Sequence, residues 1–402
     1  MDVARLRDDT PGCSPAGTPS GTNGGHIHLN NAGAALMPRP VLKAVRDYLE
    51  LEARLGGYEA ADAAADAIED AYAAVAHLLG SRPDQVAFTE HATASFVAAL
   101  SSIPLREGDV VLTTRADYVS NQIQYLSLAE RFGIEVVRAP DAPEGGVDVG
   151  AMEELIHRRR PRVVAVTHIP TNSGLVQDVA AIGALCRARD VWYLVDACQS
   201  VGQMPVHPEE IGADFLSATA RKFLRGPRGA GFLWVSERAL DAGLTPLFPD
   251  LRGADWIDES LVQPAPGARR FESWEFFWGL VLGTGAAARY ATDLGLDAIE
   301  TRIRRLAEEL RAALAEVPGV RVLDHGAELG AIVTVAVEGH EPPALMRKLR
   351  DRGVHTTGQG RLDAVLDYDA KEVAGALRLS PHVYNTSEEI REAVAILDEL
   401  LR

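Results

Sequence analysis

An aspartate and a lysine lie at the ends of two apolar segments in the middle of the chain. Asp196 follows the apolar run 192–195, and Lys222 follows a second apolar run and precedes a turn rich in glycine and proline, 226–231. At the ends of parallel strands, both side chains would face the crevice in which α/β proteins bind ligands. Alone, the aspartate would be a turn or helix-cap residue, and the lysine a solvated surface group. Together with Gln199, they indicate a chemical site.

The chemistry of pyridoxal 5′-phosphate (PLP) requires these residue types together. A lysine amine holds PLP as a Schiff base, and a carboxylate keeps its ring nitrogen protonated, so that the ring accepts electrons from the substrate Cα. Lys222 and Asp196 suit these two roles, and Gln199 could hydrogen-bond a ring substituent. Once a substrate amine displaces it, Lys222 would be free to move protons at Cα. The sequence therefore predicts a PLP enzyme that acts on an amino acid.

Five further segments have the sequence pattern of a known family. They are 28–32 (HLNNA), 89–93 (TEHAT), 117–121 (DYVSN), 168–174 (HIPTNSG) and 377–386 (LRLSPHVYNT). With Asp196 and Lys222 at the ring-nitrogen and Schiff-base positions, the chain after its first 25 residues resembles the class V aminotransferase and cysteine desulfurase-like PLP enzymes. The resemblance implies an α/β fold of fold-type I, in which a large domain has a mainly parallel sheet between helices and a smaller C-terminal domain is α+β.

The resemblance also implies how the cofactor would be held. Ala92 and Thr93 open a helix after a short strand, where backbone N–H groups and the threonine hydroxyl would meet the phosphate. Tyr118 stands where family members stack an aromatic ring, often histidine, on the cofactor. Arg221, directly before the lysine, replaces a histidine of the desulfurases and could still contact the phosphate.

Other residues would contact the phenolic oxygen of PLP and the substrate. Either Thr171 or Asn172 would hydrogen-bond the phenolic oxygen, and Gln199 would support the same atom. Arg378 would hold the α-carboxylate of the substrate by a bidentate, charge-assisted contact. Asn31, from the first of the five motifs, is also expected to bind substrate.

Two departures from the family pattern bear on the reaction. The segment 354–365 lies where persulfide-forming desulfurases carry a mobile catalytic cysteine, and it has none. The three cysteines of the chain are Cys13, Cys186 and Cys198. The spacing from Lys222 to the following Gly-Pro pair is longer than in desulfurases and resembles the isopenicillin N epimerase-like and C–S lyase-like branch. A persulfide relay is therefore not expected.

A homodimer with shared sites is expected from the resemblance. The segment 270–276 (RFESWEF) lacks the Gly-Thr pair with which relatives reach the phosphate of a neighbouring subunit, which leaves that contact open. Tyr58 would contact the substrate or the site of a partner subunit. Alternatively, the Gly56-Gly57 pair before it only ends a helix.

Three hypotheses for the function follow. The first is a C–S lyase that cleaves an S-substituted cysteine by β-elimination in a biosynthetic pathway, since elimination needs no relay cysteine. The second is an aminotransferase or epimerase of the class V family. The third is a non-catalytic PLP-binding protein. The presence of Asp196, Lys222 and Arg378 together argues against it.

Composition limits the partners and the compartment. The 402 residues suit a large domain plus a small one. A net charge of −17 argues against nucleic acid and against anionic membranes as partners. Three cysteines at wide spacing and the absence of a signal-peptide pattern favour a cytoplasmic protein.

Strands and helices alternate through most of the chain. Apolar strands are predicted at 86–88, 110–113, 134–137, 163–167, 192–195, 214–217 and 231–235, with helices between them, which indicates a parallel sheet. Long helices at 277–294 and 298–316 precede a smaller region of strands and helices. The predicted organisation is a disordered tail at 1–25, a large PLP-binding domain at 26–270, of which 26–55 pack with the small domain, and a small domain at 271–402.

Overall fold

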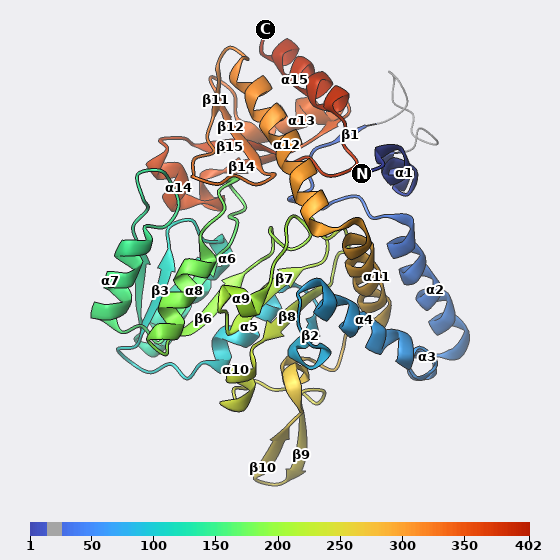
Figure 1. The fold of residues 1–402 in the computed structure, drawn as a ribbon, viewed down its shortest axis with the longest axis vertical. Helices are drawn as coiled ribbons and strands as arrows, with labels where there is room; N and C mark the ends of the chain where they lie inside the picture. The colour runs from blue at the N-terminus through green and yellow to red at the C-terminus, as the bar shows by residue number, and fades with distance from the viewer. Residues whose placement is uncertain (14–25) are drawn as a thin grey trace.

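A seven-stranded sheet forms the centre of the larger part of the molecule (Figure 1). The computed structural model describes residues 1–13 and 26–402. The strands lie in the order β2-β8-β7-β6-β5-β3-β4. β8 runs antiparallel to β2 and β7, and the other neighbouring pairs run parallel. Their bounds are β2 (Val86–Thr89), β3 (Val110–Thr114), β4 (Glu135–Ala139), β5 (Val163–Thr167), β6 (Trp192–Asp196), β7 (Phe215–Thr219) and β8 (Gly231–Val235). The predicted mainly parallel α/β fold is confirmed.

The central strands are apolar on both faces, because helices cover both sides of the sheet. Alternate residues of a strand point to opposite faces, and the two faces of β5 pack into different cores: Val164 and Val166 into one, Val163 and Ala165 into the other. The first core also contains α4 (Ala65–Leu78), α7 (Val149–Arg159) and α8 (Val179–Ala188). The second contains α5 (Ala92–Ser102) and α6 (Val119–Phe132).

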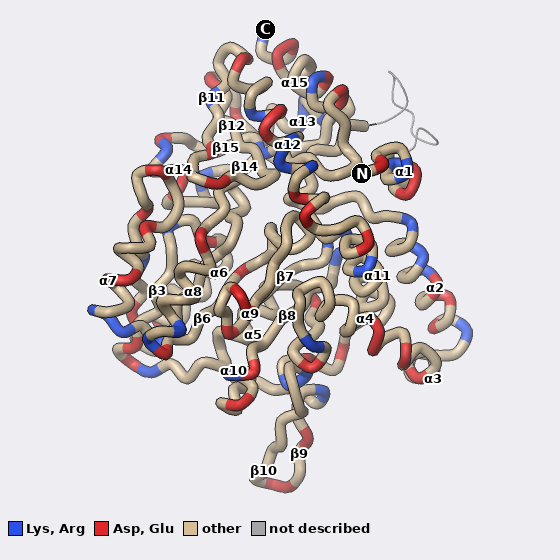
Figure 2. Tube along the Cα trace, viewed as in Figure 1, with Lys and Arg blue, Asp and Glu red and all other residues tan. Residues whose placement is uncertain are grey.

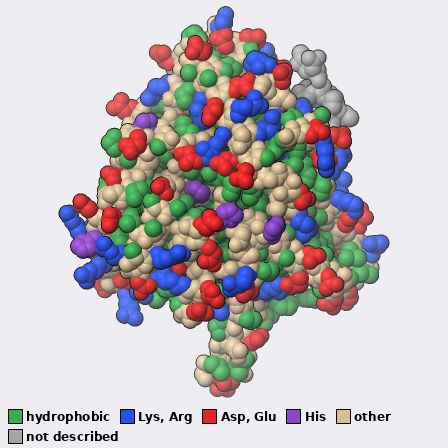
Figure 3. All heavy atoms as spheres, viewed as in Figure 1, with side chains coloured by type: hydrophobic (Ala, Val, Ile, Leu, Met, Phe, Trp, Pro, Cys, Tyr) green, Lys and Arg blue, Asp and Glu red, His purple; other side chains and the backbone are tan. Residues whose placement is uncertain are grey.

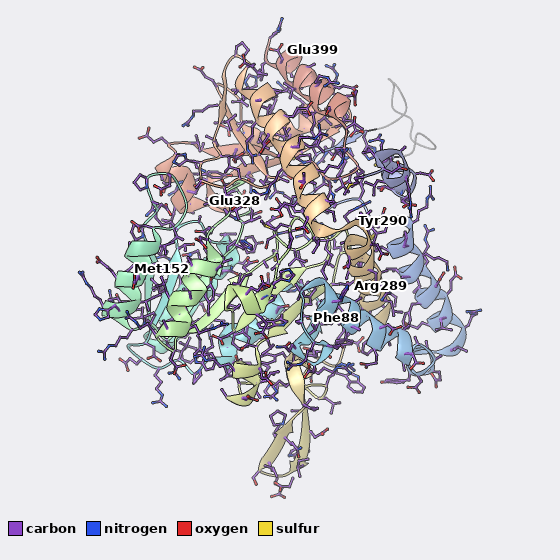
Figure 4. All side chains as sticks on the ribbon, viewed as in Figure 1. Phe88, Met152, Arg289, Tyr290, Glu328 and Glu399 are labelled. Carbon is purple, nitrogen blue, oxygen red and sulfur yellow. The ribbon has the colours of Figure 1, made fainter. Side chains whose placement is uncertain are left out.

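Aromatic packing joins the edge of the sheet to the helices. Phe88 of β2, labelled in Figure 4, meets Tyr72 of α4 edge to face, with ring centroids 4.7 Å apart. The Tyr72 hydroxyl donates to Glu272, which also accepts from the backbone N–H of Phe88 and pairs with Arg252. The buried Glu272 thus joins the sheet edge, α4 and the segment that precedes α11 (Trp278–Leu294).

The smaller part is built on a four-stranded antiparallel sheet at the top of Figure 1. Its strands lie in the order β11 (Val320–Val322), β12 (Val333–Val337), β15 (Gly375–Leu379) and β14 (Thr357–Gly360). Its helices are α12 (Leu296–Ala315), α13 (Pro342–Asp351), α14 (Val365–Ala370) and α15 (Ser387–Leu401). Leu306, Leu310 and Leu314 of α12 are buried at helical spacing, as the sequence pattern predicts.

Two segments cross between the larger and the smaller part. Near the N-terminus, β1 (Ile27–His28) pairs in parallel with β13 (Val354–His355) of the smaller part. Helix α11, which leads into α12 of the smaller part, packs along α2 (Arg39–Leu55) and α4 of the larger part, with Gly285 so close to Ala71 that an added Cβ would stand 2.6 Å from the Ala71 Cβ. The division into domains at residues 270 and 271 stays a prediction.

The N-terminal residues are more ordered than the sequence suggested. Helix α1 (Val3–Asp8) and the turn η1 (Pro11–Cys13) replace part of the tail that we predicted to be disordered, and Leu6 is 2% exposed. The composition of this segment is polar on average, but Leu6 is buried and two polar contacts hold the segment in place, from Arg7 to Glu389 and from Arg225 to Thr10. Residues 14–25 of the predicted tail lie outside the described residues.

A projecting hairpin was not predicted. Strands β9 (Ala254–Asp258) and β10 (Leu261–Pro264) pair only with each other and extend from the lower end of the molecule (Figures 1 and 3). Trp256 is 76% exposed, and acidic residues mark the hairpin tip in Figure 2. Within the part of the chain that the structure describes, we find no helix with the length and apolar character of a membrane span. The remaining short helices are α3 (Gly57–Ala63), α9 (Pro208–Ile211) and α10 (Glu237–Asp241).

Candidate active site

A cavity that is partly open to solvent lies at the carboxyl ends of β5, β6 and β7. This edge of a parallel sheet is where α/β proteins bind ligands. The cavity brings together most of the residues predicted for the cofactor, namely Ala92, Thr93, Tyr118, Thr171, Asp196, Gln199, Arg221 and Lys222. Asn172, Asn31, Tyr58 and Arg378 do not line it.

Lys222 lies in a compact turn after β7. The turn is closed by backbone hydrogen bonds from Gly226 to Ala220 and from Arg225 to Lys222, and Arg225 adopts the left-handed conformation with φ of 62°. The lysine is 8% exposed, and its Nζ lies 5.9 Å from the centroid of the Tyr118 ring. Burial lowers the pKa of Lys222, which increases the fraction of neutral, nucleophilic amine.

Asp196 is the last residue of β6 and is 4% exposed. Its Oδ1 accepts a hydrogen bond from the backbone N–H of Cys198 at 3.0 Å, and its Oδ2 accepts one from Asn121 Nδ2 at 3.1 Å. These two donors fix the orientation of the carboxylate in the cavity. A fixed carboxylate is the group that a protonated pyridine nitrogen requires.

The start of α5 is a site for an anion. Ala92 is the first residue of the helix, and the His91 side chain caps it by accepting from the backbone N–H of Ala94. Gly231 brings β8 against this helix end, where an added Cβ would stand 2.7 Å from the Ala92 nitrogen. The free backbone N–H groups and the Thr93 hydroxyl can therefore receive a phosphate.

Arg221 adds a positive charge to the same cavity. It is half-buried and donates to the backbone oxygen of Gly33. Burial and the neighbouring Arg228 lower its pKa. A guanidinium remains charged, so Arg221 can bind an anion but is a poor general acid.

Thr171 faces the cavity, and its neighbour Asn172 does not. The Thr171 hydroxyl accepts from Gln199 Nε2 at 3.2 Å. Asn172 instead donates to Asp367 of α14, with Nδ2 and Oδ2 2.7 Å apart. Of the two alternatives left open by the sequence, Thr171 therefore has the geometry for a contact with the cofactor.

Arg378 lies beside the cavity, where Thr171 connects the two. Its Nη1 donates to the Thr171 backbone oxygen at 2.9 Å and to the hydroxyl at 2.7 Å. Its Nη2 lies 3.4 Å from both Asn30 Oδ1 and Thr357 Oγ1. Among the described residues no carboxylate pairs with this guanidinium, which is 5% exposed and has an unpartnered Nε. Burial lowers the pKa of Arg378 to about 10.

Asn31 and Tyr58 do not have the geometry of direct ligands within this chain. Asn31 is fully buried, donates to the Ser380 backbone oxygen at 2.6 Å and accepts from the Tyr384 hydroxyl. Tyr58 on α3 is 74% exposed and lines a different cavity together with Trp274. Asn30, which the sequence reasoning missed, contacts Arg378 in place of Asn31.

A family model described as "Aminotransferase class-V" matches residues 27–392 of the chain. The chain belongs to the class V aminotransferase family. Its cofactor is PLP, and it is a PLP-dependent enzyme. The residues of the cavity also fit this cofactor. They include a buried lysine, a carboxylate and a helix start that can bind an anion, and Gln199 Oε1 has no partner among the described residues.

Several relatives of this class V enzyme are similar over most of their length. A probable cysteine desulfurase from Methanothermobacter thermautotrophicus is 30% identical over 386 residues, covering 93% of this chain and 94% of that protein. A probable hercynylcysteine sulfoxide lyase from Mycobacterium tuberculosis is 29% identical over 366 residues, 90% of this chain and 87% of that protein.

Solved structures share the fold of the class V enzyme. A cysteine desulfurase from Thermococcus onnurineus NA1 aligns with a TM-score of 0.88 and 24% identity, over 99% of this chain and 98% of its own. A cystine C–S lyase in complex with cysteine persulfide aligns with a TM-score of 0.83 and 22% identity, over 93% of this chain and 97% of its own.

Burial disfavours the thiolate form of all three cysteines of the class V enzyme. Cys186 lies in the core, Cys13 lies in η1, and burial raises the pKa of both thiols. Cys198 lines the cavity, and burial next to Asp196 raises the pKa of its thiol as well. Because the thiolate is the nucleophile, these thiols have low reactivity.

Proposed function

We propose that this class V enzyme cleaves the Cβ–S bond of an S-substituted L-cysteine by β-elimination, as one step of a biosynthetic pathway. The observation that carries the proposal is the cysteine-free segment of β13, β14 and the turn η4 (Arg361–Asp363), which contains Thr357, a neighbour of the Arg378 guanidinium. A desulfurase needs a nucleophilic thiol to accept the sulfur, whereas an elimination releases the sulfur with its substituent. Names of the relatives, cysteine desulfurase and hercynylcysteine sulfoxide lyase, support a sulfur-containing amino acid as substrate.

We assign the substrate carboxylate to Arg378. Its unpartnered Nε and its weakly engaged Nη2 can donate side by side to two carboxylate oxygens, which is the bidentate geometry that guanidinium groups favour. A buried cation without a carboxylate partner is costly, and the substrate would supply the missing charge. Thr171 would hold Arg378 in register with the cofactor.

The remaining steps follow from the placement of the side chains. PLP, when bound, supplies the electron sink for the pair released at Cα. In our proposal Lys222 would remove the Cα proton of the substrate, Asp196 would keep the ring nitrogen protonated, and Tyr118 would pack against the ring. The Cβ–S electron pair leaves with sulfur, which takes up a proton to give a thiol. Water hydrolyses the remaining 2-aminoacrylate to pyruvate and ammonia.

The test is a parallel measurement of products from the PLP-loaded protein. L-Cysteine, L-cystine, S-alkyl cysteines and their sulfoxides would be supplied in turn, and pyruvate, alanine, ammonia and the sulfur product would be quantified. Pyruvate and the sulfur product in equal amounts support elimination. Alanine with released sulfur would establish desulfuration instead, and amine transfer to an added 2-oxo acid or inversion at Cα would establish an aminotransferase or an epimerase.

A homodimer and a cytoplasmic location are part of the proposal. Trp256 of the projecting hairpin, Tyr58 of α3 and Trp274 are large apolar side chains left exposed in one chain, and a second copy would cover such residues. In a dimer, Tyr58 would act at the partner's site rather than at its own. Light scattering of the purified protein would measure the mass of the particle. Three free cysteines agree with a reducing compartment.

A further inference from the structure

Asp117, a second buried carboxylate, lies next to the cofactor cavity and has no role in the reaction described above. It follows β3 and is 6% exposed. Its Oδ1 accepts from the Thr167 hydroxyl at 2.6 Å and from the backbone N–H of Tyr118 at 2.7 Å. Its Oδ2 accepts from the Thr113 hydroxyl at 2.8 Å and from Gln122 Nε2 at 3.2 Å. Burying a carboxylate costs free energy. We therefore expect Asp117 to have a function that offsets this cost.

Asn121 connects this carboxylate to the one at the ring nitrogen. Its amide nitrogen lies 3.1 Å from Asp117 Oδ1 and 3.1 Å from Asp196 Oδ2. A side-chain amide nitrogen has two hydrogens, so Asn121 can donate one to each carboxylate. Asn121 is itself 2% exposed and lies in the first turn of α6.

The Asp117 carboxylate also binds the backbone of Tyr118, the aromatic residue of the cavity. The backbone N–H of Tyr118 donates to Asp117 Oδ1, and Tyr118 precedes the first residue of α6 and lies beside Lys222. Asp117 therefore contacts, directly or through one residue, both groups that would touch the cofactor ring: the stacking residue and the carboxylate at the ring nitrogen.

We propose that Asp117 and Asn121 are positioning residues for the cofactor ring, which fix Tyr118 and Asp196 relative to each other. The proposal rests on the PLP site and is independent of the reaction that follows. Without the Asn121 amide, the Asp196 carboxylate would keep only the Cys198 N–H as a donor and could rotate away from the ring nitrogen. The ring would then lose a charge-assisted contact and its fixed orientation.

The test compares two neighbouring substitutions. Asn121→Leu removes the donor shared by both carboxylates, whereas the control Gln122→Leu removes a donor to Asp117 that does not contact Asp196. For each purified holoprotein we would measure the PLP dissociation constant and the circular dichroism of the bound cofactor in the visible range, which reports a fixed ring. We expect Asn121→Leu to weaken PLP binding roughly tenfold and to diminish the dichroic band, and Gln122→Leu to change both little.

A double-mutant cycle shows whether Asn121 acts through Asp196. In an Asp196→Ala background the donor of Asn121 has no carboxylate to orient at the ring nitrogen, so most of the effect of Asn121→Leu on PLP binding should disappear. An undiminished effect in that background would overturn the proposal, as would equal effects of the Asn121 and Gln122 substitutions. If Asn121→Leu does not fold, Asn121→Ala would be measured in the same cycle.

Discussion

Arg378 donates from Nη1 to both the backbone oxygen and the hydroxyl of Thr171, at 2.9 and 2.7 Å. One threonine thereby links Arg378, which we propose binds the substrate carboxylate, to Gln199 in the cofactor cavity. The hydroxyl of Thr171, in the loop that follows β5, accepts from both side chains. A substrate held by Arg378 would be aligned with the cofactor by this contact.

We predict that Arg378→Lys raises KM for amino-acid substrates. Lysine keeps the charge but cannot donate two parallel hydrogen bonds, and a loss of roughly 10- to 100-fold in kcat/KM is expected for a contact to a charged group. Steady-state kinetics with the best substrate would measure it. The control is Arg361→Lys on η4, because Arg361 forms an exposed pair with Asp369. Equal KM values for wild type and Arg378→Lys would show that the carboxylate binds elsewhere.

Substitutions at Thr171 and Asn172 should have different effects. Thr171→Val removes the hydroxyl that accepts from both Arg378 and Gln199, and it should weaken PLP binding and raise KM together. Asn172→Ala removes only the contact with Asp367 of α14 and should leave the PLP dissociation constant unchanged. Titration of the apoprotein with PLP would compare them. A larger loss of PLP affinity in Asn172→Ala would reverse the assignment.

Lys222→Ala should abolish covalent attachment of the cofactor. Borohydride reduction of the loaded wild type should leave a pyridoxyl group on the peptide that contains residue 222, and mass spectrometry would locate it. In Lys222→Ala no labelled peptide is expected. The control is Lys371→Ala, since Lys371 pairs with Asp367 on α14 and should not affect the label. Labelling of another lysine in the wild type would contradict the site.

Much of the fold follows from patterns that are local in the sequence. The continuous apolar run of β5, VVAVT, is typical of a strand buried on both faces, and it is buried throughout. The hairpin β9–β10 was missed because exposed and acidic residues interrupt its pattern, and its strands have no other partner in the sheets. Helix α1 was missed because it is short and buries one residue, Leu6, which leaves no apolar periodicity in the sequence.

At some positions of the site, the sequence identifies a pair of neighbouring residues but not which of the two faces the site. Asp196 and Lys222 follow apolar strands, and strand ends mark the ligand edge of a parallel sheet. Asn30 and Asn31 are neighbours, and only the packing of β1 and β15 determines which of them faces Arg378. The Asp117–Asn121 pair did have a signal, since an aspartate just before a helix can accept hydrogen bonds from the first turn.

The pH dependence of stability should show the effect of His382, which is buried in its neutral form. Its Nε2 donates to the Phe223 backbone oxygen at 2.9 Å, and its Nδ1 accepts from the backbone N–H of Val383 at 2.7 Å. Protonation would place two N–H groups against each other, and burial with the nearby Arg225 lowers the pKa to about 3.

Because this folded-state pKa lies below that of the unfolded chain, about 6.5, the unfolded state binds the proton more readily. The contribution of His382 is therefore fully present above pH 6.5 and is lost as the pH falls toward 3. Linkage gives a loss of about 1 kcal/mol between pH 6.5 and 5.5 from this group. Urea unfolding at these two pH values would measure it, and His382→Gln, which keeps one donor and one acceptor, should show a smaller decrease. An equal decrease in both proteins would assign the pH dependence to other groups.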